Sequence, residues 1–348
     1  MNFIVIFGGE SYEHEISIVS AITLKKELKN IAYFIFIDAD NEMFLIPHNA
    51  MKSTHFSTYA YKKNTKLSFV KGGFLEQGFF KKQILQGIVI NLIHGKSGED
   101  GQIPSILDFY NIAYIGPRIQ ASVISFSKEL TKIYAKSLGV QVLDFQTFTK
   151  STIKNANITF PCIIKPSHLG SSIGIAVAKD KNDLSYCLDC AFEFDESVIV
   201  EDFIPHIREF NLAGCKVKDE FIFSMIEEVK KNELFAFEDK YLDFQGSKAK
   251  QEADLSDEIK ATIKAYFMKI YEDCFEGALI RCDFFMLEKD GRSEIYLNEI
   301  NPIPGSLAYY LFDDISHILQ QLSQNLPKKR FIPIKYHYIS RIQAQKGK

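Results

Sequence analysis

The 348-residue sequence lacks the features of membrane-spanning, secreted and nucleic-acid-binding proteins. No apolar run approaches the roughly 18 residues that a membrane-spanning helix needs. The N-terminus has no basic segment, and its apolar stretch is too short for a signal peptide. Positive charge is not in excess, because 41 Lys and Arg stand against 44 Asp and Glu, whereas nucleic acid demands clustered basic residues. We therefore expect a cytoplasmic protein with no membrane or nucleic-acid partner.

The cysteine spacing indicates neither a redox centre nor a zinc site. Six cysteines are present, and in a cytoplasmic protein we expect them to be reduced. Cys187 and Cys190 form the one C-x-x-C pair, but they lie inside a helix-like stretch, 183–194, whereas a redox motif opens a helix after a strand. No second pair at matched spacing completes a zinc site. Both thiols are interpreted as ordinary helical side chains.

Two common nucleotide-binding fingerprints are also missing. No Gly-Lys-Ser/Thr run opens a helix, so there is no Walker A loop. The glycines at 8–9 do not have the spacing of a dinucleotide fingerprint. Residues 165–174 instead form a Gly/Ser-rich loop between two predicted strands, with Lys165 at its leading edge. A lysine and backbone N–H groups suit a polyphosphate, although an ordinary hairpin loop is the alternative.

Lys128 is a second candidate for binding an anion. It falls in the first turn of a helix predicted over 127–138, with Ser127 as N-cap and Gly139 as the stop signal. The helix dipole disfavours a cation at this end, and a nearby anionic ligand would offset that cost. A surface lysine whose stem covers apolar residues is an equally good interpretation of the position alone.

Length and patterning predict two or three domains of mixed α/β and α+β class. Strand and helix signals alternate in the first third, with strands over 3–7, 32–37 and 87–93 and a helix over 103–110. Such alternation indicates a parallel sheet with crossover helices. Gly116-Pro117 is the first strong break, and the segment that follows has the pattern of a separate α+β unit.

A predicted hairpin near the C-terminal end carries the most informative polar residues. Its strands, 278–287 and 295–301, flank an Asp-Gly turn signal at 290–291. Because side chains alternate along a strand, a turn centred on Gly291 places Asp283 opposite Glu299 and Arg281 opposite Asn301 on one face. A one-residue slip would put Asn298 across from Asp283. Carboxylate and amide oxygens suit magnesium, while a solvated salt-bridge lattice is the alternative.

Six motifs occur in one order along nearly the whole chain, and together they closely resemble the D-alanine–D-alanine ligase family of the ATP-grasp type. They are Glu13-x-Glu15-Ile-Ser17, His94-Gly-x-x-Gly98-Glu-Asp-Gly101, Lys165-Pro-Ser-x-x-Gly-Ser-Ser-x-Gly174, Lys240-Tyr241, Arg281-x-Asp283 and Glu299-x-Asn301. The resemblance implies three domains: an N-terminal substrate domain with a parallel sheet (1–116), a central subdomain with the phosphate loop (117–208) and a C-terminal subdomain with the magnesium and oxyanion site (209–348). It further implies ATP, two magnesium ions (or manganese) and a homodimer.

The resemblance also assigns roles to single residues. The metal ligands would be Asp283, Glu299 and Asn301. The nucleotide ligands would be Lys128, Lys165 and Ser172 on the phosphates, Glu201 and Glu209 on the adenosine, and Lys240 near the γ-phosphate. The catalytic residues would be Glu13 on the first ammonium, Ser171 and Tyr241 in a network with it, and Arg281 and Gly305 at the oxyanion. The remaining substrate contacts would be His94, Ser306 and Leu307.

Several of these residues have simpler interpretations. Glu13 near a helix start could merely complement the dipole, and His94 before a glycine could be an ordinary turn histidine. Tyr241 could be a packing anchor, and Glu201 a rim charge. The sequence also departs from the family pattern, because the Pro-Gly turn at 304–305 runs directly into Ser306-Leu307 without the usual intervening residues.

The implied activity is the ATP-dependent joining of two D-alanine molecules through an acyl phosphate, for peptidoglycan synthesis. Another ATP-grasp ligase, for example one that makes D-alanine–D-lactate, is the nearest alternative, and the tyrosine at 241 argues against it because its hydroxyl suits an amine nucleophile. A non-catalytic nucleotide-binding protein is disfavoured by the intact acidic set of the hairpin. A nicotinamide dehydrogenase is disfavoured by the missing glycine fingerprint.

Overall fold

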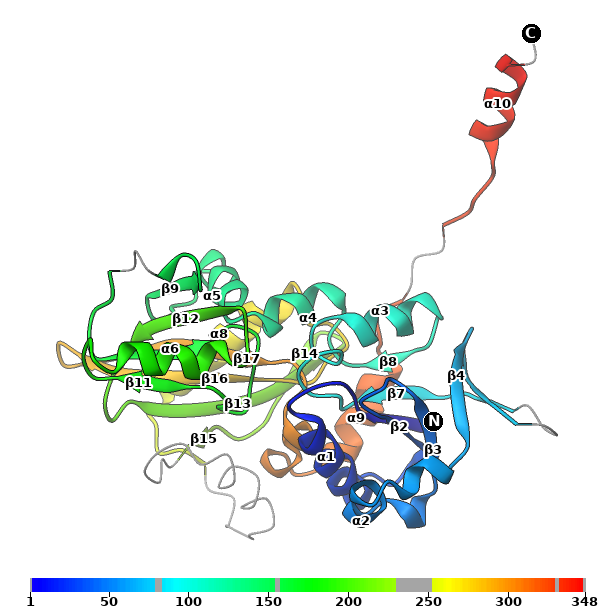
Figure 1. Cartoon of the computed structure of the whole chain (residues 1–348), viewed down its shortest axis with the longest axis horizontal. Coiled ribbons are helices and arrows are strands. Elements are labelled where there is room, and N and C mark those ends of the chain that lie inside the picture. Colours follow the sequence, from blue (N-terminus) through cyan, green and yellow to red (C-terminus); the bar gives the residue numbers. More distant parts are fainter. Residues whose placement is uncertain (1, 79–82, 154–156, 230–251, 329–331, 347–348) are drawn as a thin grey trace.

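The computed structural model describes residues 2–78, 83–153, 157–229, 252–328 and 332–346, and these form three sheets in consecutive stretches of the chain (Figure 1). The mixed α/β class expected from the sequence is confirmed, while the boundaries at 116 and 208 stay predictions. The first sheet has the order β6-β5-β4-β3-β2-β1-β7-β8. Its strands are β1 (Phe3–Gly8), β2 (Ile31–Ile37), β3 (Met43–Ile46), β4 (Lys66–Val70), β5 (Gly73–Glu76), β6 (Ile84–Leu85), β7 (Ile88–Asn91) and β8 (Tyr114–Ile115).

Only part of this sheet is parallel. β1 pairs in parallel with β2 and β7, and β7 with β8, as the alternation of strand and helix predicts. Helix α1 (His14–Glu27) makes the crossover from β1 to β2, and α3 (Gln102–Phe109) the one from β7 to β8. From β2 to β6 the pairing is antiparallel, which the sequence analysis did not predict. These short strands need no crossover helix, because antiparallel neighbours can be joined by tight turns such as the one at Gly72 (φ +80°).

The core beneath α1 is rich in phenylalanine. Every residue of β1 is buried, as expected for a central parallel strand covered on both faces. Phe7 packs on Phe36 at 5.4 Å between ring centroids and edge-on to Phe56 at 5.5 Å. Phe56 belongs to the short helix α2 (Ser53–Ser57), so these rings tie α2 to the sheet.

The second sheet is antiparallel and has the order β11-β10-β12-β9. Its strands are β9 (Phe145–Thr149), β10 (Cys162–Pro166), β11 (Ala176–Ala178) and β12 (Ser197–Asp202), and the helices of this stretch are α4 (Ile119–Phe126), α5 (Lys128–Ser137) and α6 (Leu184–Phe192). Helix α6 covers one face and packs on Cys162 and Ile164. The alternate residues Ile163 and Lys165 therefore point to the opposite face.

The third sheet carries the predicted hairpin. Its strands are β13 (Arg208–Val217), β14 (Glu220–Phe223), β15 (Glu227–Glu228), β16 (Ile280–Lys289) and β17 (Arg292–Asn301). Helix α8 (Asp257–Glu272) packs through Phe267 on Cys282 and Phe284, so Arg281 and Asp283 lie on the other face. That face meets the second sheet, because the Lys165 ammonium lies 3.4 Å from the Asn298 amide oxygen.

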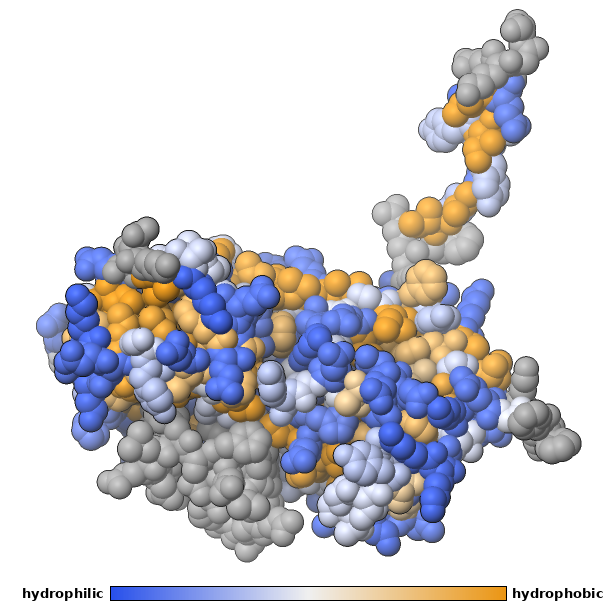
Figure 2. Space-filling model, viewed as in Figure 1, coloured by the Kyte–Doolittle hydropathy of each residue, from blue (hydrophilic) through white to orange (hydrophobic). Residues whose placement is uncertain are grey.

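The C-terminal part returns to the first sheet. The 3-10 segment η5 (Gly305–Leu311) lies against α1, and α9 (Ile315–Gln324) against β8 and β13. Helix α10 (His337–Lys346) stands away from the body in Figure 1. Its apolar residues, including Tyr338 and Ile342, are exposed (Figure 2). Among the described residues, no helix combines the length and the apolar character needed to cross a bilayer.

Candidate active site

The hairpin of β16 and β17 has the predicted register. Arg281 pairs with Asn301 and Asp283 with Glu299, so four polar residues come together. This register does not arise from a turn centred on Gly291, as the sequence predicted. Lys289 pairs with Arg292 across a two-residue turn, and this ladder continued regularly would place Asn298 opposite Asp283. A β-bulge at that point takes up the extra residue on β17 and restores the Asp283–Glu299 pair.

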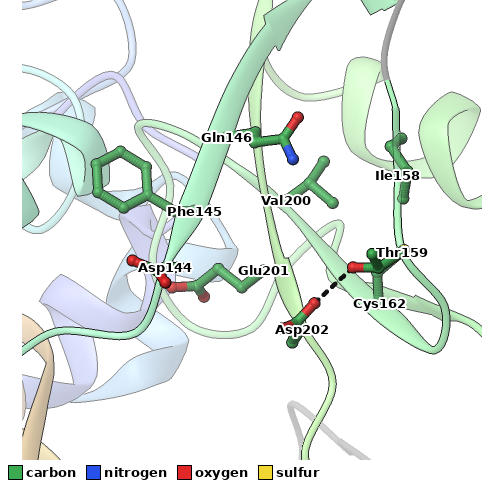
Figure 3. A pocket seen from close by; sticks show the side chains of 9 residues that line it. All are labelled: Asp144, Phe145, Gln146, Ile158, Thr159, Cys162, Val200, Glu201 and Asp202. Carbon is green, nitrogen blue, oxygen red and sulfur yellow. Dashed lines mark hydrogen bonds between the residues drawn. The ribbon is translucent and has the colours of Figure 1, made fainter.

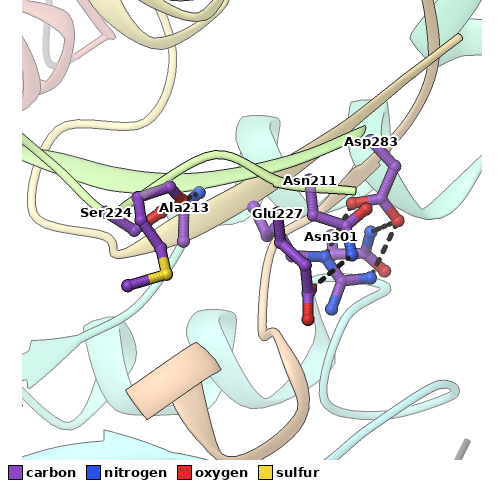
Figure 4. A network of polar contacts seen from close by, with 8 residues as sticks. Asn211, Ala213, Ser224, Glu227, Asp283 and Asn301 are labelled. Atoms are coloured by element: carbon purple, nitrogen blue, oxygen red, sulfur yellow. Dashed lines mark hydrogen bonds and ion pairs between the residues drawn. The ribbon is translucent and has the colours of Figure 1, made fainter. Parts of the chain in front are cut away.

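A buried polar network surrounds Asp283. The Arg281 guanidinium donates to both carboxylate oxygens, through Nε at 2.6 Å and Nη2 at 2.8 Å, and the Asn301 amide donates at 3.0 Å. Asn211 lies opposite Asp283 on β13 and donates to Glu227 at 3.2 Å (Figure 4). Asp283 is only 2% exposed. The face is therefore enclosed, unlike the solvated salt-bridge lattice that was the alternative.

Burial and neighbouring charges act on the protonation of Asp283. Burial raises the pKa of Asp283 to about 7; Arg281 opposes the rise, and Glu299 and Glu209 add to it. No group of three or more His, Cys, Asp or Glu in the described residues is arranged to hold a metal by those residues alone. The predicted set has two carboxylates and one amide oxygen. Such hard oxygen donors fit magnesium, which takes its remaining ligands from phosphates and water.

Lys165 and Glu201 form a buried ion pair across the second sheet. Lys165 lies on β10, and its ammonium donates to Glu201 Oε2 at 2.6 Å. The other oxygen, Oε1, is bound by Lys132 of α5. Burial would raise the pKa of Glu201, but the two ammonium groups lower it to about 2. Glu201 is therefore a buried charge partner of lysines, not the rim charge that was its simpler interpretation.

Lys128 is not a surface lysine. It is the first residue of α5, after the N-cap Ser127, whose hydroxyl accepts from the Leu130 N–H at 3.3 Å. Its ammonium reaches across to donate to the Leu169 carbonyl of the Gly/Ser-rich loop. Burial lowers the pKa of Lys128. The position next to the loop agrees with an anion-binding role.

One cavity between the second and third sheets gathers the predicted nucleotide ligands. Its polar wall consists of Lys128, Lys165, Ser171, Ser172, Glu201, Asp202, Glu209, Asn298 and Glu299. Its apolar wall includes Leu143, Ile163, Ile204, Ile207 and Phe285. A cationic end beside an apolar slot suits a molecule with a polyphosphate and a flat ring system.

A second cavity lies at the end of β9 and β12 (Figure 3). It is lined by Asp144, Thr159 and Asp202 among others, and the Thr159 hydroxyl donates to Asp202 at 2.7 Å. Its lining holds carboxylates and no lysine. A polyphosphate would be repelled there, so the lysine-lined cavity is the nucleotide candidate.

Glu13 connects the segment before α1 to the Gly/Ser-rich loop. It directly precedes α1, and its carboxylate accepts a hydrogen bond from the Ser171 hydroxyl. The other oxygen, Oε2, is buried and has no hydrogen-bond partner in the described part of the chain. Burial raises the pKa of this carboxyl group. A helix-dipole role alone does not explain a buried carboxylate oriented in this way, whereas a substrate ammonium would satisfy it.

His94 and the Pro-Gly segment meet through Ser20. The Ser20 hydroxyl accepts from the Ser306 N–H at 3.0 Å and lies 3.3 Å from His94 Nε2. Burial lowers the pKa of His94 to about 4, so the ring is neutral near pH 7. Ser306, Leu307 and the next residue have positive φ values of 49–54°, and this left-handed turn follows directly from Gly305. Ser306 and Leu307 are both buried, and Ser20 links Ser306 to His94.

Several polar residues of the site were not predicted from the sequence, among them Lys132, Asn298 and Ser20. Lys132 lies one helical turn after Lys128, a spacing that could have revealed it. The position of Asn298 depends on the β-bulge in β17, which the sequence does not reveal. Ser20 carries no sequence signal because its hydrogen-bond partners are distant along the chain. The predicted residues Lys240 and Tyr241 lie outside the described residues.

The comparisons with known proteins agree with the geometry. Family models described as D-ala D-ala ligase N-terminus and C-terminus match residues 2–117 and 134–318. The chain is similar to D-alanine–D-alanine ligases of Campylobacter jejuni and Wolinella succinogenes, each 52% identical over the full length of both chains.

Solved structures give the same result. The D-alanine–D-alanine ligase of Helicobacter pylori is 47% identical, with a TM-score of 0.84 over 95% of this chain and 100% of that one. The VanG D-Ala:D-Ser ligase of Enterococcus faecalis is 25% identical, with a TM-score of 0.73 over 93% and 98%. Sequence, fold and full-length coverage agree, and the chain belongs to the D-alanine–D-alanine ligase family.

Proposed function

We propose that this protein joins two D-alanine molecules into D-alanyl-D-alanine and converts ATP to ADP and phosphate, as a cytoplasmic step of peptidoglycan precursor synthesis. The contact between Ser171 and Glu13 carries the proposal. It links the phosphate loop to a buried carboxylate that suits an amino-acid ammonium. A substrate held by Glu13 would have its own carboxylate close to the phosphate end of the lysine-lined cavity.

In the nucleotide site, Lys128 and Lys165 would hold the phosphates together with Ser172, and the apolar wall would hold the base. Glu201 and Glu209 line the same cavity and would contact the adenosine part. Lys240 would approach the γ-phosphate. Positioning and charge neutralisation supply most of the catalysis in phosphoryl transfer, and the lysines provide both.

The residues Asp283, Glu299 and Asn301 would hold two magnesium ions. When bound, magnesium neutralises charge on the transferring phosphoryl group. Arg281 would remain on Asp283, which fixes the carboxylate at the metal side of the site.

In the first step, the carboxylate of the first D-alanine attacks the γ-phosphorus, which forms an acyl phosphate and releases ADP. Glu13 holds the ammonium, and neutral His94 lies near the carboxylate as a hydrogen-bonding group. Water must be excluded because it would hydrolyse the acyl phosphate.

In the second step, the amine of the second D-alanine attacks the acyl carbon after it loses a proton, and phosphate leaves. Tyr241, Ser171 and Glu13 would orient this amine, with Ser306 and Leu307 at its carboxylate and methyl group. Arg281 and the Gly305 N–H would stabilise the tetrahedral oxyanion, a kind of interaction worth about 3–4 kcal/mol per donor.

Product analysis tests the proposal. The purified protein is mixed with ATP, magnesium and D-alanine, phosphate release is followed, and the product is identified by mass spectrometry. L-alanine serves as the control substrate, and D-lactate as a competitor near neutral pH. We expect D-alanyl-D-alanine and one phosphate per dipeptide. Absence of D-alanine-dependent phosphate release, or a D-alanine–D-lactate product in competition, would refute it.

The family resemblance also supports a homodimer. Light scattering on the eluted protein should give about twice the 39.8 kDa chain mass. A monomeric mass at micromolar concentration would contradict this part of the proposal.

A further inference from the structure

Lys132 is a buried cation with no role in the chemistry above. It lies one helical turn beyond Lys128 on α5 and is 2% exposed. Its ammonium forms an ion pair with Glu201 Oε1, while Lys165 binds Oε2 at 2.6 Å. Two ammonium groups thus share one carboxylate. The group of three carries a net charge of +1, in a place where water does not screen it.

The two lysines differ in their access to the cavity. Lys165 lines it, but Lys132 does not. Lys132 lies behind Glu201, with its ammonium 5.8 Å from the centre of the Phe145 ring. A phosphate in the cavity can therefore recruit Lys165 and cannot reach Lys132 in the same way.

A phosphate oxygen that binds Lys165 weakens the ion pair between Lys165 and Glu201. The Lys165 ammonium has three N–H donors, so it can contact a phosphate while its ion pair with Glu201 weakens as the ammonium moves towards the ligand. A buried carboxylate that loses its last cationic partner is strongly destabilised. With Lys132 on the other oxygen, Glu201 keeps a partner throughout.

We propose that Lys132 is a positioning residue for nucleotide binding: it holds the Glu201 carboxylate in a charge pair, so that Lys165 is free to exchange Glu201 for a phosphate. This inference rests on the proposed use of the cavity for ATP. Lys132 itself touches no substrate. It acts by leaving one unit of positive charge available at the phosphate end.

The proposal predicts a specific pattern of nucleotide affinities. In Lys132→Met, Lys165 and Glu201 form a neutral, tightly engaged pair, so the KM for ATP and the dissociation constant of ADP should rise about 10- to 100-fold. The kcat at saturating ATP should change by less than about fivefold, since Lys132 is remote from the reacting atoms. Adding Glu201→Gln to Lys132→Met removes the carboxylate that engages Lys165, so the double variant should regain most of the affinity that Lys132→Met loses for inorganic tripolyphosphate, a probe without the adenosine that Glu201 would contact.

Lys136→Met is the matched control. Lys136 lies one turn further along α5 and pairs with exposed Asp144 at 3.4 Å, so this variant removes the same charge from the same helix away from Glu201. Its nucleotide affinity should stay within twofold of the unmodified protein.

If Lys132→Met does not fold, the comparison moves to the Glu201→Gln background. There the added Lys132→Met change should leave ADP affinity within about threefold, because no carboxylate remains to be held. Unchanged ADP affinity in Lys132→Met, or a double variant that binds tripolyphosphate no better than that single variant, would overturn the proposal. ADP binding by calorimetry does not depend on D-alanine chemistry, so failure of the proposed ligase reaction would be recognised separately.

Discussion

Replacing Arg281 by alanine separates transition-state stabilisation from nucleotide binding. The guanidinium has five N–H donors, and two of them donate to Asp283 at 2.6 and 2.8 Å. The others can point to an oxyanion that forms beside the hairpin. Loss of one such donor lowers turnover by about 10²- to 10³-fold, or roughly 3–4 kcal/mol. We expect that loss in kcat for Arg281→Ala, while ADP affinity changes little because Lys128 and Lys165 remain.

The same substitution has a structural cost that must be measured separately. Asp283 is 2% exposed, and it would keep the hydrogen bond from the Asn301 amide but lose both bonds from the guanidinium. Breaking a buried ion pair from one side destabilises a protein by about 3–5 kcal/mol. Urea denaturation should show a loss of this order. Arg281→Lys keeps the charge but not the two-pronged geometry, so both effects should be smaller.

The assay is D-alanine-dependent phosphate release at saturating ATP, with ADP affinity by calorimetry on the same preparations. A folded Arg281→Ala protein that turns over within tenfold of the unmodified enzyme would remove Arg281 from the oxyanion role. A large loss of ADP affinity with unchanged kcat would instead assign it to nucleotide binding.

Three further predictions concern other parts of the site. Burial lowers the pKa of His94 to about 4, so the unfolded state binds more protons at this residue and its contribution to the unfolding free energy should fall as pH drops from 6.5 towards 4; Glu201, with a pKa of about 2 against 4.5, adds a second fall below pH 4.5, whereas Asp283, whose pKa burial raises to about 7, contributes a rise between pH 7 and 4. The His94 contribution amounts to about 3 kcal/mol in full, and it is isolated by comparing urea curves of the unmodified protein with those of His94→Asn; equal changes between pH 6.5 and 4.5 in the two proteins would contradict it. Ser20→Ala leaves the buried Ser306 N–H without its acceptor, so stability should drop by about 1–3 kcal/mol and the KM for D-alanine should rise with no change for ATP; an equal rise for both substrates would argue against a local effect. Tyr241→Phe should weaken the preference for D-alanine over D-lactate, and unchanged selectivity in competition would rule that role out.

Local patterns in the sequence determined much of the fold. The parallel strands around β1, the capped helix that begins at Lys128 and the hairpin turn at 290–291 each follow from short-range signals, because periodicity and capping act over a few residues. The order of six motifs was enough for the family, since each motif keeps its residue types and spacing regardless of what surrounds it.

What the sequence did not reveal depends on contacts between distant segments. The antiparallel half of the first sheet comes from short strands with weak patterns. The bulge at Asn298 decides which residue faces Asp283, and only the packed third sheet selects it over a regular ladder. Ser20 acquires a role because η5, nearly three hundred residues later, packs on α1.

The sequence by itself therefore determined the chemistry available to this protein: the acidic hairpin, the lysine-led loop and the Glu, His and Ser motifs. The tertiary structure alone decided how the charges are shared, with Lys132 and Lys165 on one carboxylate and Arg281 on another. This sharing of partners affects stability because a buried charge is no longer solvated by water and depends on the few partners that the fold brings to it.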